Sequence, residues 1–214
     1  MINVLQFTGG PIHDVCAIGD EINGILTASN EFRVTRVDED LDVFTRPSLD
    51  QHDVIVFYYT FGEMNADQRR GLLRFVSRGK GFVGVHPAIG LESTPPDYQS
   101  FVGGWFLYHP PYHRYQVSIR DAEHPITRGL AGPDGEAVDE FFVADEQFIM
   151  SYDPRVHILA TALHKGRAHP VAWTKPWGEG RVYYLALGHD VNAVRDAMFG
   201  KLLARGILWA AGGG

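Results

Sequence analysis

The chain has 214 residues, 45% of them hydrophobic, with a net charge of −7 and a single cysteine. A chain of this length can bury about 70% of its unfolded surface, so it needs neither a disulfide nor a metal merely to fold. The scattered basic residues exclude a nucleic-acid-binding patch, and no apolar run approaches the roughly 20 residues that cross a bilayer. Because no secretion signal is visible, we expect a cytoplasmic protein without nucleic-acid or membrane partners.

Short apolar runs and helical patterns alternate in the first half of the chain. Four strands are predicted, at residues 2–7, 32–37, 54–59 and 82–85. The last two are almost entirely apolar, as expected of strands that are buried on both faces. One helical pattern begins at Val15, and another opens at Asn65, which with Gln68 resembles a capping box. This alternation predicts a mostly parallel, doubly wound α/β sheet.

The second half of the chain is less regular. Residues 90–113 contain two Pro-Pro pairs and several aromatic residues, a composition typical of a long ordered loop that is functional or carries short helices. Four further strands are predicted at residues 115–120, 157–162, 170–174 and 181–187, and a last helix is predicted at 191–211. The last two of these strands are joined by a hairpin-type turn. Because no repeat or linker interrupts the pattern, residues 1–214 are predicted to form one domain.

Three predicted strands are each followed by a histidine, namely His13, His86 and His189. Ligands of open α/β sheets bind outside the carboxyl ends of the strands. Histidine titrates near neutral pH and is the commonest metal ligand, and this chain has ten of them. Any one of the three could be an ordinary polar residue, but together they indicate one functional centre.

The residues beside these histidines allow two interpretations each. Asp14 and Asp190 precede helical patterns, so each could cap a helix or take part in the site. Gly9 and Gly10 could simply turn the chain, or could leave backbone N–H groups free for a ligand. The phosphate-binding and dinucleotide-binding fingerprints are both absent, so no nucleotide cofactor is expected.

The glycine-rich loop at residues 103–111 brings aromatic residues next to a histidine. Aromatic faces beside polar groups suit sugars and other planar-faced ligands. Trp105, Phe106 and Tyr108 could therefore form a wall for a sugar, or could belong to an ordinary core. His109 follows them and adds a polar group to the same loop.

Acyl transfer through a nucleophile finds no support in the sequence. Cys16 lies inside the first helical pattern and looks like a small core residue. No Gly-x-Ser-x-Gly elbow is present, and the corresponding strand-to-turn position holds His86. If the protein is an enzyme, its catalytic groups are therefore expected to be imidazoles and carboxylates. The acidic stretch that contains Asp139 and Glu140 is either a solvated face or the source of a base or metal ligand.

Eight short runs occur in order along nearly the whole chain, at residues 9–14, 79–88, 103–111, 124–127, 139–140, 170–173, 180–190 and 209–212. They include GGPIHD, GKGFVGVHPA, GGWFLYHPP and GRVYYLALGHD. Any one run is weak evidence, but the ordered set is specific. Together they resemble the ThuA-like (trehalose utilisation) family.

The resemblance implies the class I glutamine amidotransferase-like fold, a flavodoxin-like three-layer α/β/α sandwich with a mostly parallel sheet. His86 would stand where an amidotransferase has its nucleophilic cysteine, and His189 would stand where it has its histidine. Because the cysteine is replaced, glutaminase activity is not expected.

The family is associated with catabolism of trehalose and related disaccharides, alongside oxidoreductases that make 3-keto sugars. A carbonyl acidifies the neighbouring C–H, so the resemblance implies an enzyme that acts on a keto-sugar by proton abstraction, isomerisation or elimination. The alternative is a non-catalytic sugar-binding or accessory subunit that works with a sugar dehydrogenase. A homo-oligomer is compatible with either function.

The implied centre acts by acid–base catalysis or holds Zn²⁺ or Mn²⁺. Its expected catalytic or metal-binding members are His13, His86, His189, His109 and Glu140. Asp14 and Asp190 are expected to orient the ring nitrogens of the histidines. The expected sugar-binding residues are Gly10, Trp105, Phe106, Tyr108, His109 and Asp139.

Overall fold

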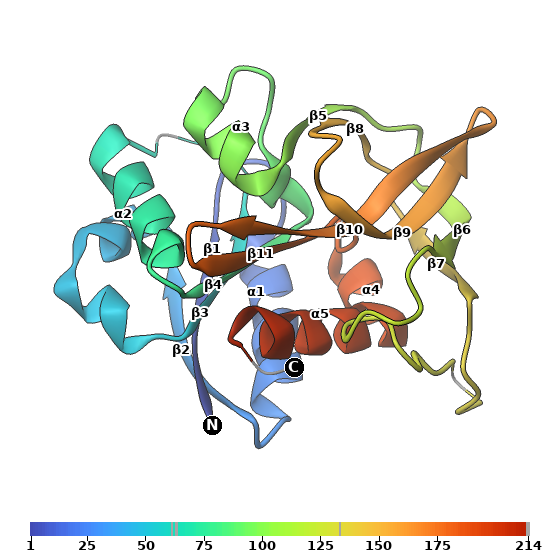
Figure 1. Cartoon of the computed structure of the whole chain (residues 1–214), viewed down its shortest axis with the longest axis horizontal. Helices are drawn as coiled ribbons and strands as arrows, with labels where there is room; N and C mark the ends of the chain where they lie inside the picture. The colour runs from blue at the N-terminus through green and yellow to red at the C-terminus, as the bar shows by residue number, and fades with distance from the viewer. Residues whose placement is uncertain (61, 63, 133, 213–214) are drawn as a thin grey trace.

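A nine-stranded sheet forms the centre of the protein, for which a computed structural model describes residues 1–60, 62, 64–132 and 134–212 (Figure 1). Its strands in spatial order are β2 (Phe32–Asp38), β1 (Ile2–Gly9), β3 (Val54–Tyr59), β4 (Gly81–Val85), β11 (Gly180–Leu185), β10 (Arg167–Trp177), β9 (His157–His164), β6 (His113–Ile119) and β7 (Glu140–Asp145). A separate two-stranded sheet pairs β5 (Gly104–Tyr108) with β8 (Ile149–Tyr152).

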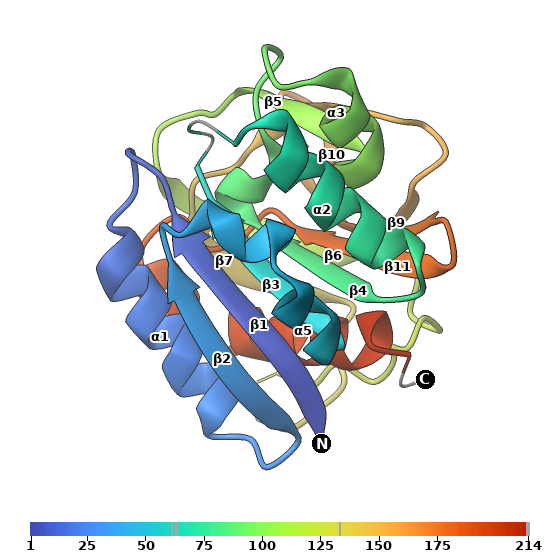
Figure 2. The same ribbon diagram turned by 90° about the vertical axis from the view of Figure 1, so that its left-hand side faces the viewer.

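The first five strands in spatial order, β2-β1-β3-β4-β11, are parallel. Their order is flavodoxin-like, and the direction in which the chain adds strands changes between β1 and β3. Helix α1 (Val15–Thr27) packs against β1 and β2, and α5 (Ala197–Ala210) packs against β3, β4 and β11. Helices α2 (Ala66–Ser77) and α3 (Pro96–Val102) lie on the other side of the sheet (Figure 2). The predicted mixed α/β fold with a large, mostly parallel sheet is confirmed.

Beyond β11 the sheet continues with four strands, β10, β9, β6 and β7, that pair antiparallel. The hairpin between β10 and β11 agrees with the predicted turn. The sequence analysis missed β5, β7 and β8, whereas α3 lies in the segment 90–113, for which short helices were one of the expectations. In β7 only every second residue is buried, and the acidic residues at its ends hide this alternation. The contacts do not establish a three-layer sandwich for this antiparallel half.

Local sequence explains the elements that carry the site. Every residue of β3 and β4 is buried, as their apolar runs predict. Asn65 caps α2 and forms the predicted capping box with Gln68. The predicted last helix is divided into α4 (Val191–Val194) and α5, because Asp196 interrupts it and accepts a hydrogen bond from the N–H of Met198. None of the helices formed by the described residues is long and apolar enough to cross a membrane.

Candidate metal centre

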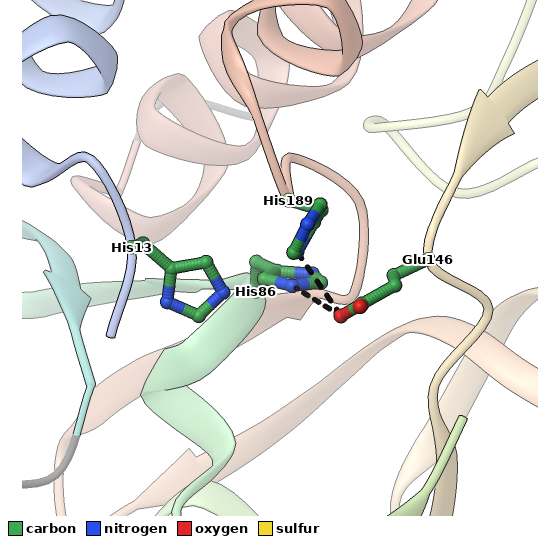
Figure 3. A group of neighbouring side chains, drawn as sticks. All are labelled: His13, His86, Glu146 and His189. Carbon is green, nitrogen blue, oxygen red and sulfur yellow. Dashed lines mark ion pairs between the residues drawn. The ribbon is translucent and has the colours of Figure 1, made fainter. Parts of the chain in front are cut away.

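Three histidines from three strand ends meet at one edge of the sheet. His13 follows β1, His86 follows β4 and His189 follows β11, and their ring centroids lie 5.2–5.4 Å apart in all three pairs. Glu146, directly after β7, is the fourth member of the group (Figure 3). One ligand atom from each of the four side chains lies within 4.8 Å of the others. The sequence analysis therefore identified the three histidines and missed the carboxylate.

His86 occupies a sharp turn at the end of β4. Its φ is +42°, an uncommon conformation for a residue other than glycine, which agrees with the elbow-like position implied by the resemblance. Gly84 makes the turn possible, because a Cβ there would lie 2.9 Å from Phe82 and 3.3 Å from Ala88. The ring Nδ1 of His86 lies 2.7 Å from the carbonyl of Ala186 and must donate to it, so the lone pair of the neutral ring is on Nε2.

The Nε2 atom of His86 is buried and has no hydrogen-bond partner among the described residues. It faces Glu146, whose Oε2 is 3.7 Å away. A buried ring nitrogen without a hydrogen-bond partner is costly unless something binds it. This atom is therefore the strongest single indication that the group holds a ligand.

His13 lies at the point where the winding of the sheet changes direction. Its Nδ1 is 2.7 Å from the hydroxyl of Thr60, which follows the neighbouring strand β3. Burial, together with the nearby His86 and His189, lowers the pKa of His13 to about 3. The ring is consequently neutral at physiological pH, which is the form that binds metals.

Glu146 is the acidic centre of the group. Its Oε2 lies 3.0 Å from Nδ1 of His189, and its Oε1 lies 3.3 Å from Nδ1 of His109. Burial opposes the charge of Glu146, but the contacts with His189 and His86 outweigh it and hold the pKa of this carboxyl well below its usual range. The contact with Glu146 in turn raises the pKa of His189. In the absence of a metal, these two side chains form an ion pair that a metal would replace.

Asp145 fixes the backbone around the group. Its buried carboxylate accepts hydrogen bonds from the N–H groups of Gly188 at 2.7 Å and His189 at 3.1 Å. Burial raises the pKa of Asp145, although His86 and the backbone donors favour its charged form. Asp145 therefore connects the end of β7 to the loop after β11. The alternating pattern of residues 140–145 is the sequence signal that could have placed Asp145 and Glu146 at a strand end.

The donor set fits a divalent transition metal. Imidazole nitrogens suit Zn²⁺ and other first-row metals, and a carboxylate also suits Mn²⁺. In a tetrahedral zinc site with bonds of about 2.0–2.2 Å, two ligand atoms lie about 3.3–3.6 Å apart. The most distant ligand atoms of the present group, which lie within 4.8 Å of one another, would have to approach by about 1 Å to close around an ion. A metal binds a histidine through an unprotonated ring nitrogen. The unpartnered Nε2 of His86 and the neutral ring of His13 can each supply one.

Several residues that were expected in the centre lie elsewhere. Glu140 is exposed on β7 and hydrogen bonds to Gln116 and Ser118, so Glu146 takes the place assigned to it. Asp139 is exposed beside it and does not line the cavity at the centre. Glu140 opens β7 and Glu146 directly follows its last residue, so the length of the strand, about 20 Å at roughly 3.3 Å per residue, keeps Glu140 away from the centre.

The two aspartates beside the histidines act as helix caps. Asp14 accepts a hydrogen bond from the N–H of Ala17 at the start of α1, and Asp190 accepts one from Ala193 at the start of α4. The ring nitrogens contact Thr60, Ala186 and Glu146 instead. Gly10 donates its N–H to Glu39, so this amide is already engaged.

A cavity of about 200 Å³ adjoins the four-residue group. Phe106 lines the cavity as expected, and Phe148 lies beside it. The ring centroid of Phe148 lies 4.0 Å from that of His86 and 4.6 Å from that of Phe106. His109 also lines the cavity but is outside the four-residue group. Trp105 and Tyr108 are not among the residues that line it.

A flavodoxin-like α/β fold with a histidine-rich centre at the carboxyl edge of its sheet defines the class of this protein. The family model for ThuA, described as trehalose utilisation, matches residues 3–210. The chain therefore belongs to the ThuA family. None of the curated proteins matches its sequence.

Solved structures share this fold. A ThuA-like protein from Parabacteroides merdae has 23% sequence identity and a TM-score of 0.86, with 99% of this chain and 90% of that chain covered. A ThuA-like protein from Bacteroides uniformis has 18% identity and a TM-score of 0.81, covering 98% and 91%. A β-galactosidase from Bacillus circulans has 15% identity and a TM-score of 0.69, covering 96% of this chain and 30% of that one. At these identities the likeness concerns the fold alone.

Proposed function

We propose that this protein is an enzyme of carbohydrate metabolism that acts on a keto-sugar at a metal ion held by the four-residue group. Membership of the ThuA family supports carbohydrate metabolism in general. The observation that carries the metal is the buried, unpartnered Nε2 of His86 beside Glu146. The cavity that adjoins this group supplies a place for a small substrate.

His13, His86, His189 and Glu146 would hold the ion, with Zn²⁺ and Mn²⁺ as the candidates. Such an ion supplies Lewis-acid polarisation of a carbonyl when bound. The hydrogen bonds of His13 to Thr60 and of His86 to Ala186 orient these two rings from their far sides. This is the arrangement that metal-binding histidines usually require.

His109 is the candidate for moving the proton. It lines the cavity without belonging to the four-residue group. Its Nδ1 lies 2.9 Å from the carbonyl of Pro110 and 3.3 Å from the carboxylate of Glu146, both of which only accept hydrogen bonds. The proton of the neutral ring is therefore on Nδ1, and Nε2 carries the lone pair that could remove the proton next to a sugar carbonyl. Isomerisation, epimerisation and elimination all begin with that step.

The test combines metal analysis with proton exchange. Protein purified without a histidine tag is expected to contain near-stoichiometric Zn or Mn by elemental mass spectrometry. With 3-keto-glucose in D₂O, it is expected to exchange the proton at C2 faster than buffer does, as followed by NMR. Removing the metal with a chelator should abolish this exchange, and adding the metal back should restore it.

Two results would contradict this proposal. Protein that neither contains nor takes up Zn²⁺ or Mn²⁺ would exclude the metal centre. Metal-loaded protein that binds keto-sugars without exchange or turnover would exclude an enzyme and would favour the accessory subunit working with a sugar dehydrogenase.

A further inference from the structure

We propose that the substrate is a glycoside with a single sugar ring and an apolar aglycone, rather than a disaccharide. This inference rests on the proposed function and specifies its substrate. The observations that carry it are the size of the cavity, the distribution of polar groups in its wall and the apolar side chains at its mouth.

The cavity has room for one ring. Its volume is about 200 Å³. An engineered protein cavity of about 150 Å³ accommodates benzene, whereas pockets for larger ligands begin at about 300 Å³. One pyranose would therefore fill the cavity, and whatever is joined to that ring must lie at the mouth.

The polar groups of the wall are confined to the centre and its immediate neighbours. They come from His13, Thr60, His109, Glu146 and His189. The remaining lining residues are apolar or glycine: Ile12, Pro87, Ile89, Gly90, Leu91, Phe106 and Phe148. A sugar with its carbonyl edge toward the histidines would place its C–H face on these apolar residues, as sugars do on aromatic rings.

Ile12 and Leu91 form the apolar part of the mouth, because they line the cavity and are also exposed to solvent, at 72% and 45%; His109, likewise exposed, is its polar part. Ile12 precedes His13, and Leu91 is held against Phe106 by a β-bridge, so two separate segments contribute to this rim. A second sugar laid over Ile12 and Leu91 would bring hydroxyl groups against side chains that offer no hydrogen bond, which is unfavourable. An aryl or alkyl group would instead cover the two exposed side chains.

The test compares three α-glucosides that share one glucosyl unit: phenyl α-D-glucopyranoside, methyl α-D-glucopyranoside and trehalose. Their binding to metal-loaded protein is measured by isothermal titration calorimetry, which needs no turnover. The phenyl glycoside is expected to bind about tenfold more tightly than trehalose, because it covers apolar surface at the rim. The methyl glycoside is expected to bind more weakly than the phenyl glycoside.

Variants of the rim separate this effect from the rest of the site. Ile12→Asn and Leu91→Asn are expected to reduce the preference for the phenyl glycoside to less than about threefold, while leaving metal content unchanged. Leu163→Asn is the matched control, because Leu163 is 71% exposed and does not line the cavity. It should leave the preference as in the parent protein.

The outcomes distinguish the inference from the proposed function. Trehalose that binds as tightly as the phenyl glycoside, or more tightly, contradicts the inference and leaves the keto-sugar function intact. A preference that survives in both rim variants also contradicts it. If the metal-loaded protein binds none of the three glucosides, the inference is wrong, whereas the keto-sugar function is decided by the exchange experiment, because these glucosides lack the carbonyl on which that function depends.

Discussion

The carboxylate of Glu146 lies 3.0 Å from Nδ1 of His189, although 43 residues separate them in the chain. The preceding residue, Asp145, holds the backbone N–H of the same histidine. Two consecutive carboxylates thus have different tasks, since one fixes the loop and the other faces the imidazole rings.

Glu146→Gln is expected to lose the metal, and Glu140→Gln is expected to keep it. Glutamine removes the negative charge that neighbours His86 and His189. Loss of an outer partner of a metal ligand already weakens binding about 10–100-fold, and loss of a ligand should exceed this. Zinc affinity of the two variants, measured by competition with a chelator, tests the difference. Equal affinities would mean that Glu146 is not a ligand.

His86→Gly is expected to be more stable than His86→Ala, by roughly 1 kcal/mol. The φ of +42° at this position strains any residue with a Cβ, whereas glycine adopts it freely. Urea denaturation of both variants measures the difference. Ala88→Gly, in the same turn but without a positive φ, is the control and should be destabilising in the usual way. The reverse order for the two His86 variants would contradict the strained turn.

Asp145→Asn is expected to destabilise the protein by about 2–4 kcal/mol. The carboxylate is buried and accepts from three backbone donors with its two oxygens, while an amide has one oxygen and would place its NH₂ against an N–H group. Thermal and urea unfolding give the size of the effect. Asp139→Asn, at an exposed site, should change stability by less than about 0.5 kcal/mol. Similar values for the two variants would exclude a positioning role for Asp145.

The metal-free protein is expected to lose stability as the pH falls from about 6.5 toward 3. Over this range His13 is protonated in the unfolded chain, where its pKa is 6.5, but stays neutral in the fold, where its pKa is about 3. The unfolded state then binds more protons, so the free energy of unfolding decreases as the pH decreases. For one titrating group, the free energy of unfolding changes by at most about 1.4 kcal/mol per pH unit. The change due to His13 is smaller, because solvent reaches part of its ring.

His189 changes the free energy of unfolding with pH in the opposite direction to His13. Its pKa is raised in the fold, so its stabilisation is complete below pH 6.5 and is lost as the pH rises through the folded pKa. Denaturation of parent and His13→Gln protein between pH 3 and 7 separates the two effects. The variant should show a shallower dependence between pH 4.5 and 6.5, and an unchanged dependence would contradict the assignment to His13.

The sequence by itself determined the elements of the parallel half of the sheet and the three histidines of the centre. Apolar runs as short as β3, with 6 residues, and β4, with 5, favour interior strands over buried helices, which is why both were located correctly. Parallel strands end at the same edge of a sheet, so His13, His86 and His189 could be placed together without knowing any contact. The cap at Asn65 is likewise set by residues within one helical turn.

Only the tertiary structure decided which carboxylate joins the histidines. Glu140 and Glu146 lie in the same acidic stretch, and their local sequence does not distinguish them. The choice depends on where β7 ends and on the hydrogen bonds from Gly188 and His189 to Asp145, which span 43 and 44 residues. Phe148, which completes the aromatic wall, was missed for the same reason. Contacts between distant segments arise from the packing of the whole sheet, and no pattern within a few residues encodes them.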